Sequence, residues 1–288
     1  MTRVLVVAHH ERDEAAVLAS QASTWLHARG HEAWMTSGDA TALGLESLAD
    51  DQPAMSADLV LSLGGDGTML RAVQMLNGAP VPIIGVNVGL LGYLAEVEPA
   101  GMIGAIERFV AGEGGGEPSF RIDERMMIDI VLHRADHTTS TWRALNEGVL
   151  EKEEPGHTIR MLVRIDGEPF TSYAADGLIA STPTGSTAYS LSARGPVVSP
   201  RHRALLLTPV SPHMLFDRTL VLDPEEAVEV ELTGHRGAVL SVDGRRTASV
   251  AHGETVSFTT SAATARFVRF GERRFHQILK SKFGLSDR

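Results

Sequence analysis

The segment from Asp58 to Asn77, DLVLSLGGDGTMLRAVQMLN, predicts a buried β-strand, a tight glycine-rich turn and a helix in succession. Leu59 to Leu63 form an almost unbroken apolar run, as in a parallel strand that is covered on both faces. The apolar residues after the turn recur at helical spacing, and Asn77-Gly78 is a typical helix end. This segment therefore predicts an α/β layer.

The turn itself predicts a ligand site. Backbone N–H groups at a helix start bind anions, and Gly64, Gly65 and Gly67 would let a ligand approach closely. Asp66 is unusual there, because a carboxylate would repel a bare phosphate. Three interpretations explain it: hydrogen bonds to backbone, a Mg²⁺ that bridges it to phosphate, or a hydrogen bond from a substrate hydroxyl. The turn lacks both the GxGxxG spacing and a following Lys-Ser/Thr pair, which disfavours Rossmann dehydrogenases and P-loop enzymes.

The rest of the N-terminal part continues the α/β pattern up to a glycine-rich linker, Gly112 to Pro118. Its expected elements are a strand at Arg3 to Ala8, a helix at Glu11 to Arg29, a strand at Glu32 to Thr36, a strand at Val81 to Val86 and a helix near Pro99 to Ala111. Short strands separated by turn residues follow, which predicts a mainly antiparallel β domain. We therefore expect an α/β domain over residues 1–116, a β domain over 117–270, and a segment 271–288 whose helix, Arg274 to Phe283, packs back on the first domain.

Composition narrows the class of protein. The formal net charge of -10 argues against nonspecific binding to nucleic acid and against an anionic membrane surface. There are no cysteines, which excludes disulfides, thiolate catalysis and cysteine-based zinc sites and fits the cytosol. The apolar run at Val4 to Ala8 is too short for a signal peptide, and the uncharged stretch from Ala72 to Ala95 is interrupted by prolines and glycines. We expect a cytoplasmic protein.

Three further segments carry polar groups suited to a nucleotide. Asp176 to Ser192, DGLIASTPTGSTAYSLS, places seven side-chain hydroxyls between Ser181 and Ser190, after an apolar strand and before a helix start. Asn146-Glu147 lie among apolar residues, and an Asn amide can read the edge of an adenine, although a polar pair at a turn would look the same. GVNVGLLGYLA, from Gly85, predicts a tight loop at the carboxyl end of a strand, where open α/β sheets bind ligands.

Together these segments resemble the NAD kinase family. GGDGT at Gly64 to Thr68, GVNVGLLGYLAEV at Gly85 to Val97, NE at Asn146-Glu147, DGLIASTPTGSTAYSLS and TPVSPHML at Thr208 to Leu215 follow the order of that family's signatures. The resemblance implies a Rossmann-like α/β N-terminal domain with a phosphofructokinase-like GGDG loop, plus a mainly β C-terminal domain that commonly assembles dimers or tetramers. It also implies transfer of a phosphoryl group to the 2′-hydroxyl of the adenosine ribose of NAD, which gives NADP.

The same resemblance assigns roles by position. Asp66 would act on the acceptor hydroxyl as base, orienter or Mg²⁺ contact, and the loop of Gly64, Gly65, Gly67 and Thr68 would hold the phosphates of ATP or another donor. The implied NAD contacts are Asp66, Gly67, Tyr93, Asn146, Glu147, Asp176, Thr187, Ala188, Tyr189 and Ser192. Mg²⁺ or another divalent cation is implied without identifiable ligands. Candidate cations for the donor's charge are Arg71, Lys152, Arg160 and Arg194.

Three positions depart from the family pattern. Arg194 stands where the family usually has glycine, and Ala174 stands at a position linked to discrimination between NAD and NADH. Gly244 stands where some members place a ligand-contacting histidine. Two alternatives remain: a lipid kinase that shares the GGDG loop, for which no membrane-facing element is visible, and a catalytically silent NAD-binding sensor, which would not need Asp66. The donor, NADH acceptance, oligomer size and allosteric ligands stay open.

Overall fold

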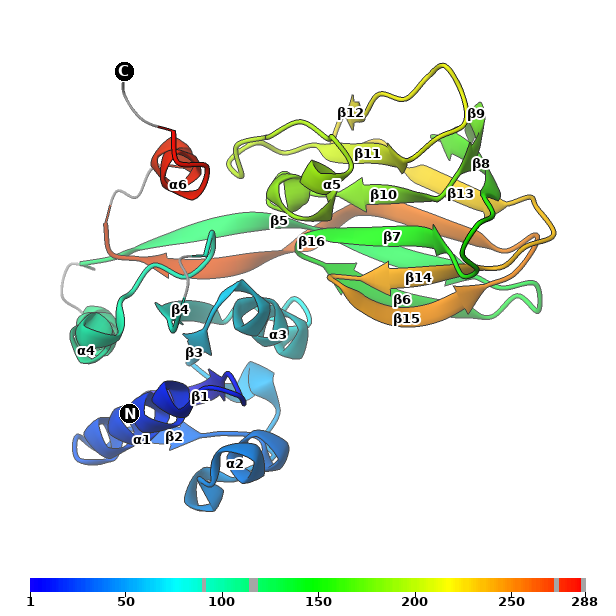
Figure 1. Cartoon of the computed structure of the whole chain (residues 1–288). Coiled ribbons are helices and arrows are strands. Elements are labelled where there is room, and N and C mark those ends of the chain that lie inside the picture. The colour runs from blue at the N-terminus through cyan, green and yellow to red at the C-terminus, as the bar shows by residue number, and fades with distance from the viewer. Residues whose placement is uncertain (90–91, 114–118, 272–274, 286–288) are drawn as a thin grey trace. The chain divides into compact units, whose positions relative to one another are not determined.

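The computed structural model describes residues 1–89, 92–113, 119–271 and 275–285, and the chain divides into two compact units (Figure 1). The first unit comprises Met1–Glu124 and Ala265–Arg288, and the second comprises Arg125–Thr264. These boundaries fall inside two long strands, β5 (Arg121–His133) and β16 (Thr255–Arg269). The sequence suggested boundaries after residue 116 and after residue 270. β16 pairs with different strands at its two ends, and no glycine or proline marks the change. Of the expected linker, residues 114–118 lie outside the described residues.

The first unit is an α/β layer, as the sequence predicts. Its parallel sheet has the order β2-β1-β3-β4, and Arg266 and Phe267 of β16 pair with β4 in parallel. The elements are β1 Arg3–Ala8, α1 Asp13–His27, β2 Glu32–Trp34, α2 Ser37–Leu43, β3 Leu59–Gly64, α3 Asp66–Leu76, β4 Pro82–Asn87, α4 Met102–Glu113 and α6 Phe275–Lys282. The predicted strand over Arg3 to Ala8 is confirmed residue for residue.

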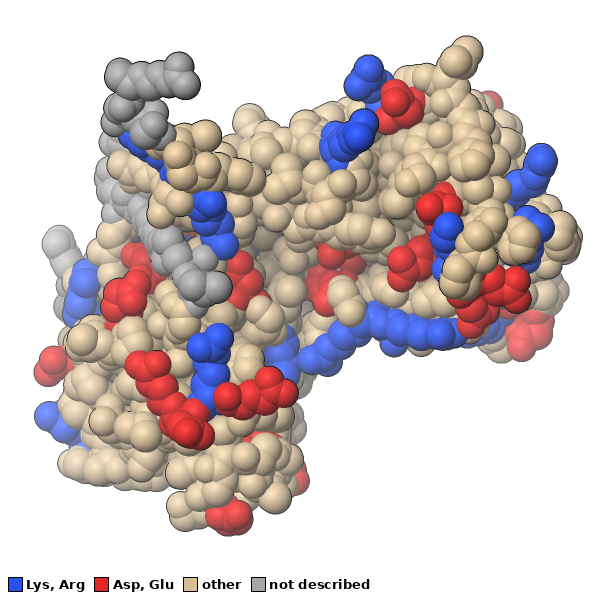
Figure 2. All heavy atoms as spheres, viewed as in Figure 1, with Lys and Arg blue, Asp and Glu red and all other residues tan. Residues whose placement is uncertain are grey.

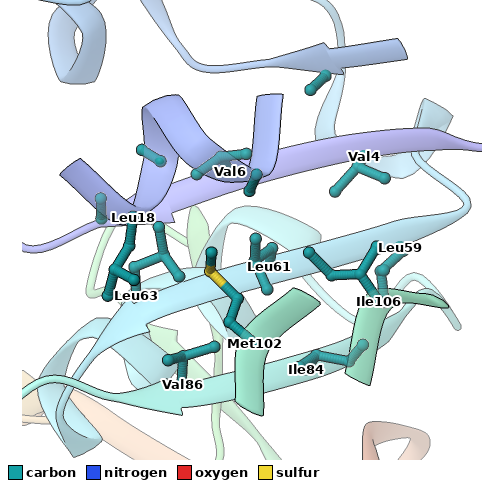
Figure 3. Close-up of a cluster of buried hydrophobic side chains, with 14 of the residues drawn as sticks. Val4, Val6, Leu18, Leu59, Leu61, Leu63, Ile84, Val86, Met102 and Ile106 are labelled. Atoms are coloured by element: carbon teal, nitrogen blue, oxygen red, sulfur yellow. The ribbon is translucent and has the colours of Figure 1, made fainter. Parts of the chain in front are cut away.

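The core of this unit explains why its central strands are apolar throughout. Alternate residues of β1, β3 and β4 pack under α1 and α4, where Leu61 and Leu63 meet Leu18 and Met102 (Figure 3). The opposite face of β3 carries α3. All six residues of β3 are buried, as expected for a parallel strand covered on both sides. Each Å² of apolar surface buried stabilises the fold by about 25 cal/mol. The packed core therefore holds the loops at the ends of the strands in place.

The second unit is mainly β, as predicted, and contains more strands than the sequence indicates. One sheet has six antiparallel strands in the order β12-β11-β10-β7-β14-β15. The second sheet contains β16, β13, β8 and β9, with β5 and β6 attached at β16. The further bounds are β6 Thr139–Ala144, β7 Glu147–Lys152, β8 Ile159–Ile165, β9 Glu168–Ala175, β10 Gly177–Ser181, α5 Tyr189–Ser192, β11 Leu205–Val210, β12 Leu220–Leu222, β13 Val228–Leu232, β14 Ala238–Val242 and β15 Arg245–Val250.

Apolar side chains from both sheets interdigitate in the core of the second unit. Ile130 of β5 and Val163 of β8 belong to the same buried cluster as Leu150 of β7 and Leu240 of β14. Such a two-sheet sandwich needs only alternate residues of each strand to be apolar. The weaker apolar signal of each strand is the reason that several of them escape prediction from sequence.

Two surface properties bear on the expected partners. Among the described residues, none of the helices has the length and apolar character that crossing a bilayer requires. Lys and Arg side chains are interspersed with Asp and Glu over the face that Figure 2 displays, in keeping with the formal net charge of -10.

Candidate functional site

The sheet of the first unit has a topological switch point between β1 and β3. The chain leaves β1 toward β2 on one side and returns to β3 on the other, so the loops that follow β1 and β3 diverge and leave a crevice at the carboxyl ends of the strands. A cavity of about 460 Å³ lies there. It is lined by Ala8, His9, His10, Glu11, Arg12, Gly65, Gly67, Thr68, Arg71 and Val88. The GGDG loop therefore contributes to a cavity, as the sequence suggested.

The glycines of this loop serve two different purposes. A Cβ at Gly64 would lie 2.2 Å from Thr68 Oγ1, so this glycine allows α3 to pack closely on β3. A Cβ at Gly65 or Gly67 would meet nothing within 4 Å, so these two leave open space beside the cavity. The expected four-residue turn is replaced by one connecting residue. β3 ends at Gly64, Gly65 is extended, and α3 begins at Asp66. Gly65 and Gly67 therefore permit close approach of a ligand. Neither of them is required by a positive φ.

The Asp66 carboxylate is bound to backbone, which is the first of the three interpretations. It accepts hydrogen bonds from the N–H groups of Tyr93 at 2.8 Å and Leu94 at 2.9 Å, in the segment after β4. It does not cap its own helix, because Gly65 is the N-cap residue. Gly92 permits the arrangement, since a Cβ there would lie 2.1 Å from Asp66 Oδ1. A carboxylate offers about four lone-pair sites, so Asp66 retains the capacity to accept from a hydroxyl or contact a cation.

Tyr93 lies beside this carboxylate. Burial raises the pKa of its phenol, and the negative charge of Asp66 raises the pKa further. Lys282 of α6 lies with Nζ 4.5 Å from the centre of the Tyr93 ring, a cation–π contact within the first unit. The phenol therefore stays neutral and available for hydrogen bonding near neutral pH.

Two arginines line the cavity, and one of them, Arg71, is paired with an aspartate. Arg71 donates from Nη1 to Asp39 Oδ1 at 2.9 Å and from Nη2 to the Ala8 carbonyl at 2.5 Å, which fixes its guanidinium beside the loop after β1. His10 Nε2 lies 2.8 Å from the same Asp39 oxygen. The Arg12 guanidinium lies close to Gly89, where a Cβ would come within 2.7 Å of Nη1. Of the candidate cations, Arg71 thus lines the cavity, and Arg12 was missed although it follows β1.

In the second unit, Asn146 and the Ser/Thr loop are joined through backbone. Thr182 donates its N–H to the Asn146 carbonyl at 2.9 Å and its hydroxyl to the Leu145 carbonyl at 2.6 Å. Gly185 packs on the same segment, because a Cβ there would lie 2.2 Å from the Asn146 carbonyl oxygen. Two motifs that are distant in sequence therefore form one local structure.

Glu147 is a buried carboxyl group with an incomplete set of hydrogen bonds. Its side chain accepts from the Tyr189 N–H, and Oε2 has no partner among the described residues. Burial raises the pKa of Glu147, and the charge of Asp243 adds to it, to about 8. At neutral pH the group is therefore protonated and can donate one hydrogen bond.

Several hydroxyls of the Ser/Thr loop are bonded to other protein groups, both inside the loop and outside it. Ser186 bonds to Pro183 and Val198, and Ser190 bonds to Thr208, with both serines fully buried. Thr187 and Ala188 are only half-buried, and Tyr189 and Ser192 are exposed. The four residues expected to contact NAD are therefore accessible: Thr187 in the short helix η4 (Gly185–Thr187), Ala188 just after it, and Tyr189 and Ser192 in α5.

Asp176 lies near this accessible group. Its Oδ1 accepts from Lys152 Nζ at 2.6 Å. The pKa of Tyr189 is raised by burial and then by the charges of Glu151 and Asp176, so the phenol and Asp176 are neighbours. Lys152 is consequently engaged with Asp176 and is not an unpaired cation.

Arg194 occupies a position that favours glycine. Its φ is 64°, and it ends α5 with two bonds: Arg194 N–H to the Leu191 carbonyl at 3.0 Å and Gly195 N–H to the Ser190 carbonyl at 2.8 Å. This pattern is a Schellman motif, in which a residue with left-handed backbone follows the helix. The left-handed backbone conformation explains why glycine suits this position in the family pattern. The arginine found here is exposed and adds a positive charge.

The described residues contain no group of three or more His, Asp or Glu side chains that could hold a metal ion. Mg²⁺ does not require one, because it is usually bound through one or two carboxylates together with substrate phosphates. Asp66, with lone pairs to spare, fits that mode of binding.

Comparison with known families matches both units. The model described as ATP-NAD kinase N-terminal domain matches residues 4–114, and the ATP-NAD kinase C-terminal domain matches residues 145–270. The chain belongs to the NAD kinase family. The NAD kinase of Heliobacterium modesticaldum is 38% identical over 288 residues, with 98% of each chain covered. That of Mycobacterium tuberculosis is 35% identical over 300 residues, with 98% of this chain and 95% of the relative covered.

Solved structures agree on the fold of this NAD kinase family member. Yeast NADH kinase complexed with NADH superposes with a TM-score of 0.89 at 24% identity, covering 100% of this chain and 89% of the other. An NAD kinase from Archaeoglobus fulgidus in complex with ATP superposes with a TM-score of 0.73 at 24% identity, covering 99% of both. At these identities the likeness establishes the fold alone.

The predicted site residues thus fall into two local groups. Asp66, Tyr93 and the GGDG loop belong to the first unit, and Asn146, Glu147 and Tyr189 form one hydrogen-bonded region of the second. Their individual roles stay predictions. Arg12, His10 and Asp243 were missed. Arg12 and His10 could have been found from their position directly after a strand, at the carboxyl edge of the sheet. Asp243 gave no such signal, because Asp243-Gly244 has the sequence of an ordinary hairpin turn.

Proposed function

We propose that the protein is an NAD kinase, which transfers the γ-phosphoryl group of ATP to the 2′-hydroxyl of the adenosine ribose of NAD and yields NADP and ADP. The observation that carries this proposal is the match of both family domains over residues 4–114 and 145–270, with Asp66 at the switch point of the first unit. The new bond joins the ribose oxygen to phosphorus, and the bond from that phosphorus to the β-phosphate oxygen breaks.

Asp66 accepts the proton of the ribose hydroxyl. Its two backbone hydrogen bonds hold the carboxylate in one orientation, and Gly67 keeps the approach to it open. In a loose phosphoryl-transfer transition state, positioning of the hydroxyl matters more than early loss of its proton. General-base assistance is worth about 10²–10⁴ in rate.

The cavity beside the GGDG loop holds the donor phosphates. Arg12 offsets part of their charge beside the Asp39-paired Arg71, and the open space at Gly65 and Gly67 admits the phosphates to the start of α3. Mg²⁺ held through the donor phosphates would neutralise charge on the phosphate oxygens. Whether ATP, another nucleoside triphosphate or polyphosphate is the physiological donor depends on groups beyond the phosphates.

The second unit recognises NAD. The Asn146 amide has the donor and acceptor geometry that suits an adenine edge, and the protonated Glu147 donates to a ring nitrogen or a ribose oxygen. Thr187, Ala188, Tyr189 and Ser192 line the accessible side of the loop, and Asp176 takes the nicotinamide side. Ala174 places no charged side chain at the position that the resemblance links to discrimination between NAD and NADH.

We also propose a cytoplasmic enzyme that forms homodimers or homotetramers and binds neither nucleic acid nor membrane. The absence of cysteines supports the cytoplasmic location, and the net charge of -10 supports the absence of nucleic-acid and membrane partners. The family resemblance is the ground for the homo-oligomer. Small-molecule nucleotides are then its principal partners.

The decisive experiment incubates the purified chain with NAD, ATP and Mg²⁺ and measures NADP. Asp66→Asn should lose about 10²–10⁴ in turnover while NAD still raises the melting temperature, because Asn removes the base and keeps one of the two acceptors for the Tyr93 and Leu94 N–H groups. The same assay with other nucleoside triphosphates, polyphosphate and NADH identifies donor and acceptor.

Asp58→Asn is the matched control. Asp58 precedes β3, is exposed, and accepts the Arg3 N–H at 2.7 Å, so the substitution removes the charge of a backbone-bound carboxylate at the opposite end of the strand. Unchanged turnover in Asp66→Asn would refute the base assignment. NAD binding without NADP formation, whichever donor is supplied, would favour the silent sensor.

A further inference from the structure

The chain contains two Asp-Gly hairpin turns with the same backbone but different carboxylates. Asp166-Gly167 joins β8 to β9 with φ values of 51° and 80°, and Asp243-Gly244 joins β14 to β15 with 45° and 77°. Asp166 is exposed and accepts one N–H, from Ala227 at 2.8 Å. Asp243 is only 7% exposed. The turn by itself therefore does not require a buried carboxylate.

The Asp243 carboxylate binds the backbone of the Asn146-Glu147 segment. Oδ2 accepts the Leu145 N–H at 2.9 Å, and Oδ1 accepts the N–H groups of Asn146 at 2.7 Å and Glu147 at 3.2 Å. The Asp243 N–H in turn donates to the Glu147 carbonyl at 3.0 Å. One side chain and its own amide thus hold three consecutive residues.

These three residues need such a partner because of the topology. β6 ends at Ala144 in one sheet, β7 begins at Glu147 in the other, and Leu145 and Asn146 connect them. Residues that pass between sheets have no ladder partner for their N–H groups, and a buried amide without a partner is costly. Burial raises the pKa of the Asp243 carboxyl, and the three backbone N–H groups oppose that shift because they stabilise its charged form. Hydrogen bonds to the charged carboxylate are stronger than bonds to a neutral acceptor.

The other side of the same segment is held by the Ser/Thr loop. Thr182 bonds to the carbonyls of Leu145 and Asn146, and Gly185 packs on the Asn146 carbonyl. The carbonyl and N–H groups of Leu145 and Asn146 are therefore all hydrogen-bonded within the protein. The groups left to contact a ligand are the side chains of Asn146 and Glu147. A displacement of the backbone would move both side chains together.

We propose that Asp243 is a positioning residue for nucleotide binding, which holds residues 145–147 so that the Asn146 and Glu147 side chains are preorganised for the adenosine part of NAD. This inference rests on the proposed function. Asp243 touches no substrate atom in this role. It acts through three backbone hydrogen bonds, so its removal should weaken NAD binding and leave the donor site in the first unit unaffected.

The test compares Asp243→Asn with Asp166→Asn in steady-state kinetics and in calorimetric titration with NAD. Asn tolerates a positive φ, so the hairpin is retained, while its NH₂ group cannot accept a hydrogen bond. We expect the KM and Kd for NAD to rise about ten- to a hundredfold, from loss of preorganisation. The KM for ATP should stay within twofold, and Asp166→Asn should match the wild type.

Several outcomes would overturn the proposal. An unchanged KM for NAD in Asp243→Asn would do so, and so would equal increases in the KM values for NAD and ATP, because these indicate a general loss of structure. Should Asp243→Asn not fold, Asp243→Gly carries the same comparison, since it removes the carboxylate and relieves the positive φ. A wild type that binds NAD without forming NADP refutes the proposed function, and the calorimetric comparison still decides the role of Asp243.

Discussion

Replacement of Glu147 by Gln should remove the pH dependence that this residue imposes on stability. The pKa of Glu147 rises from its ordinary value of 4.5 to about 8, first through burial and then through the charge of Asp243. Between these values the folded protein keeps a proton that the unfolded chain releases. Stability from this group is therefore fully present below pH 4.5 and is lost as the pH rises toward 8.

Each pH unit in this window lowers the free energy of unfolding by 1.36 kcal/mol, so Glu147 costs the wild type about 4 kcal/mol between pH 5 and pH 8. Gln has the same shape, keeps an acceptor for the Tyr189 N–H and has no proton to lose. The variant should therefore gain stability relative to the wild type as the pH rises, by about that amount.

Urea denaturation at pH 5, 6, 7 and 8 measures this difference directly. Glu168→Gln is the control, since Glu168 is exposed at the start of β9 and should give a flat difference across the series. A flat difference for Glu147→Gln as well would refute the inference that Glu147 is protonated in the folded protein at neutral pH.

Three further substitutions test local geometry. Gly92→Ala should lower turnover about 10²-fold, because a Cβ 2.1 Å from Asp66 Oδ1 displaces the carboxylate; NADP formation measures it, and unchanged turnover would contradict the role of that contact. Arg194→Gly should raise the free energy of unfolding by about 0.5–1 kcal/mol in urea, since φ is 64° there, and a loss of stability would contradict this. Gly185→Ala should cost about 2 kcal/mol or more in the same assay, because its Cβ would lie 2.2 Å from the Asn146 carbonyl oxygen, and a neutral effect would show that the loop yields.

The behaviour of Asp66 illustrates how local sequence leaves chemistry undecided. Its neighbours predict a strand end and a helix start, and both are confirmed. Its partners, the N–H groups of Tyr93 and Leu94, lie 27 and 28 residues away in the chain. No spacing rule connects such positions, so sequence could offer three interpretations of the carboxylate without choosing one.

The Ser/Thr loop shows the complementary case. Its motif identifies the region, but a hydroxyl that binds a ligand and one that bonds inside the loop look alike in sequence. Ser190 is buried against Thr208, 18 residues away, while Tyr189 beside it is exposed. Burial, which depends on packing against other strands, separates the two classes.

The sequence by itself determined the α/β layer, the mainly β second part and the family, because apolar periodicity and contiguous motifs are local properties of the chain. Only the tertiary structure decided which polar groups meet. Asp243 binds Leu145, Asn146 and Glu147 from 96 to 98 residues away, and the pKa of Glu147 is raised first by its burial and then by the charge of that carboxylate. Hydrogen bonds and charge effects depend on distance in space, and the folding of β7 and β14 into one sheet sets that distance.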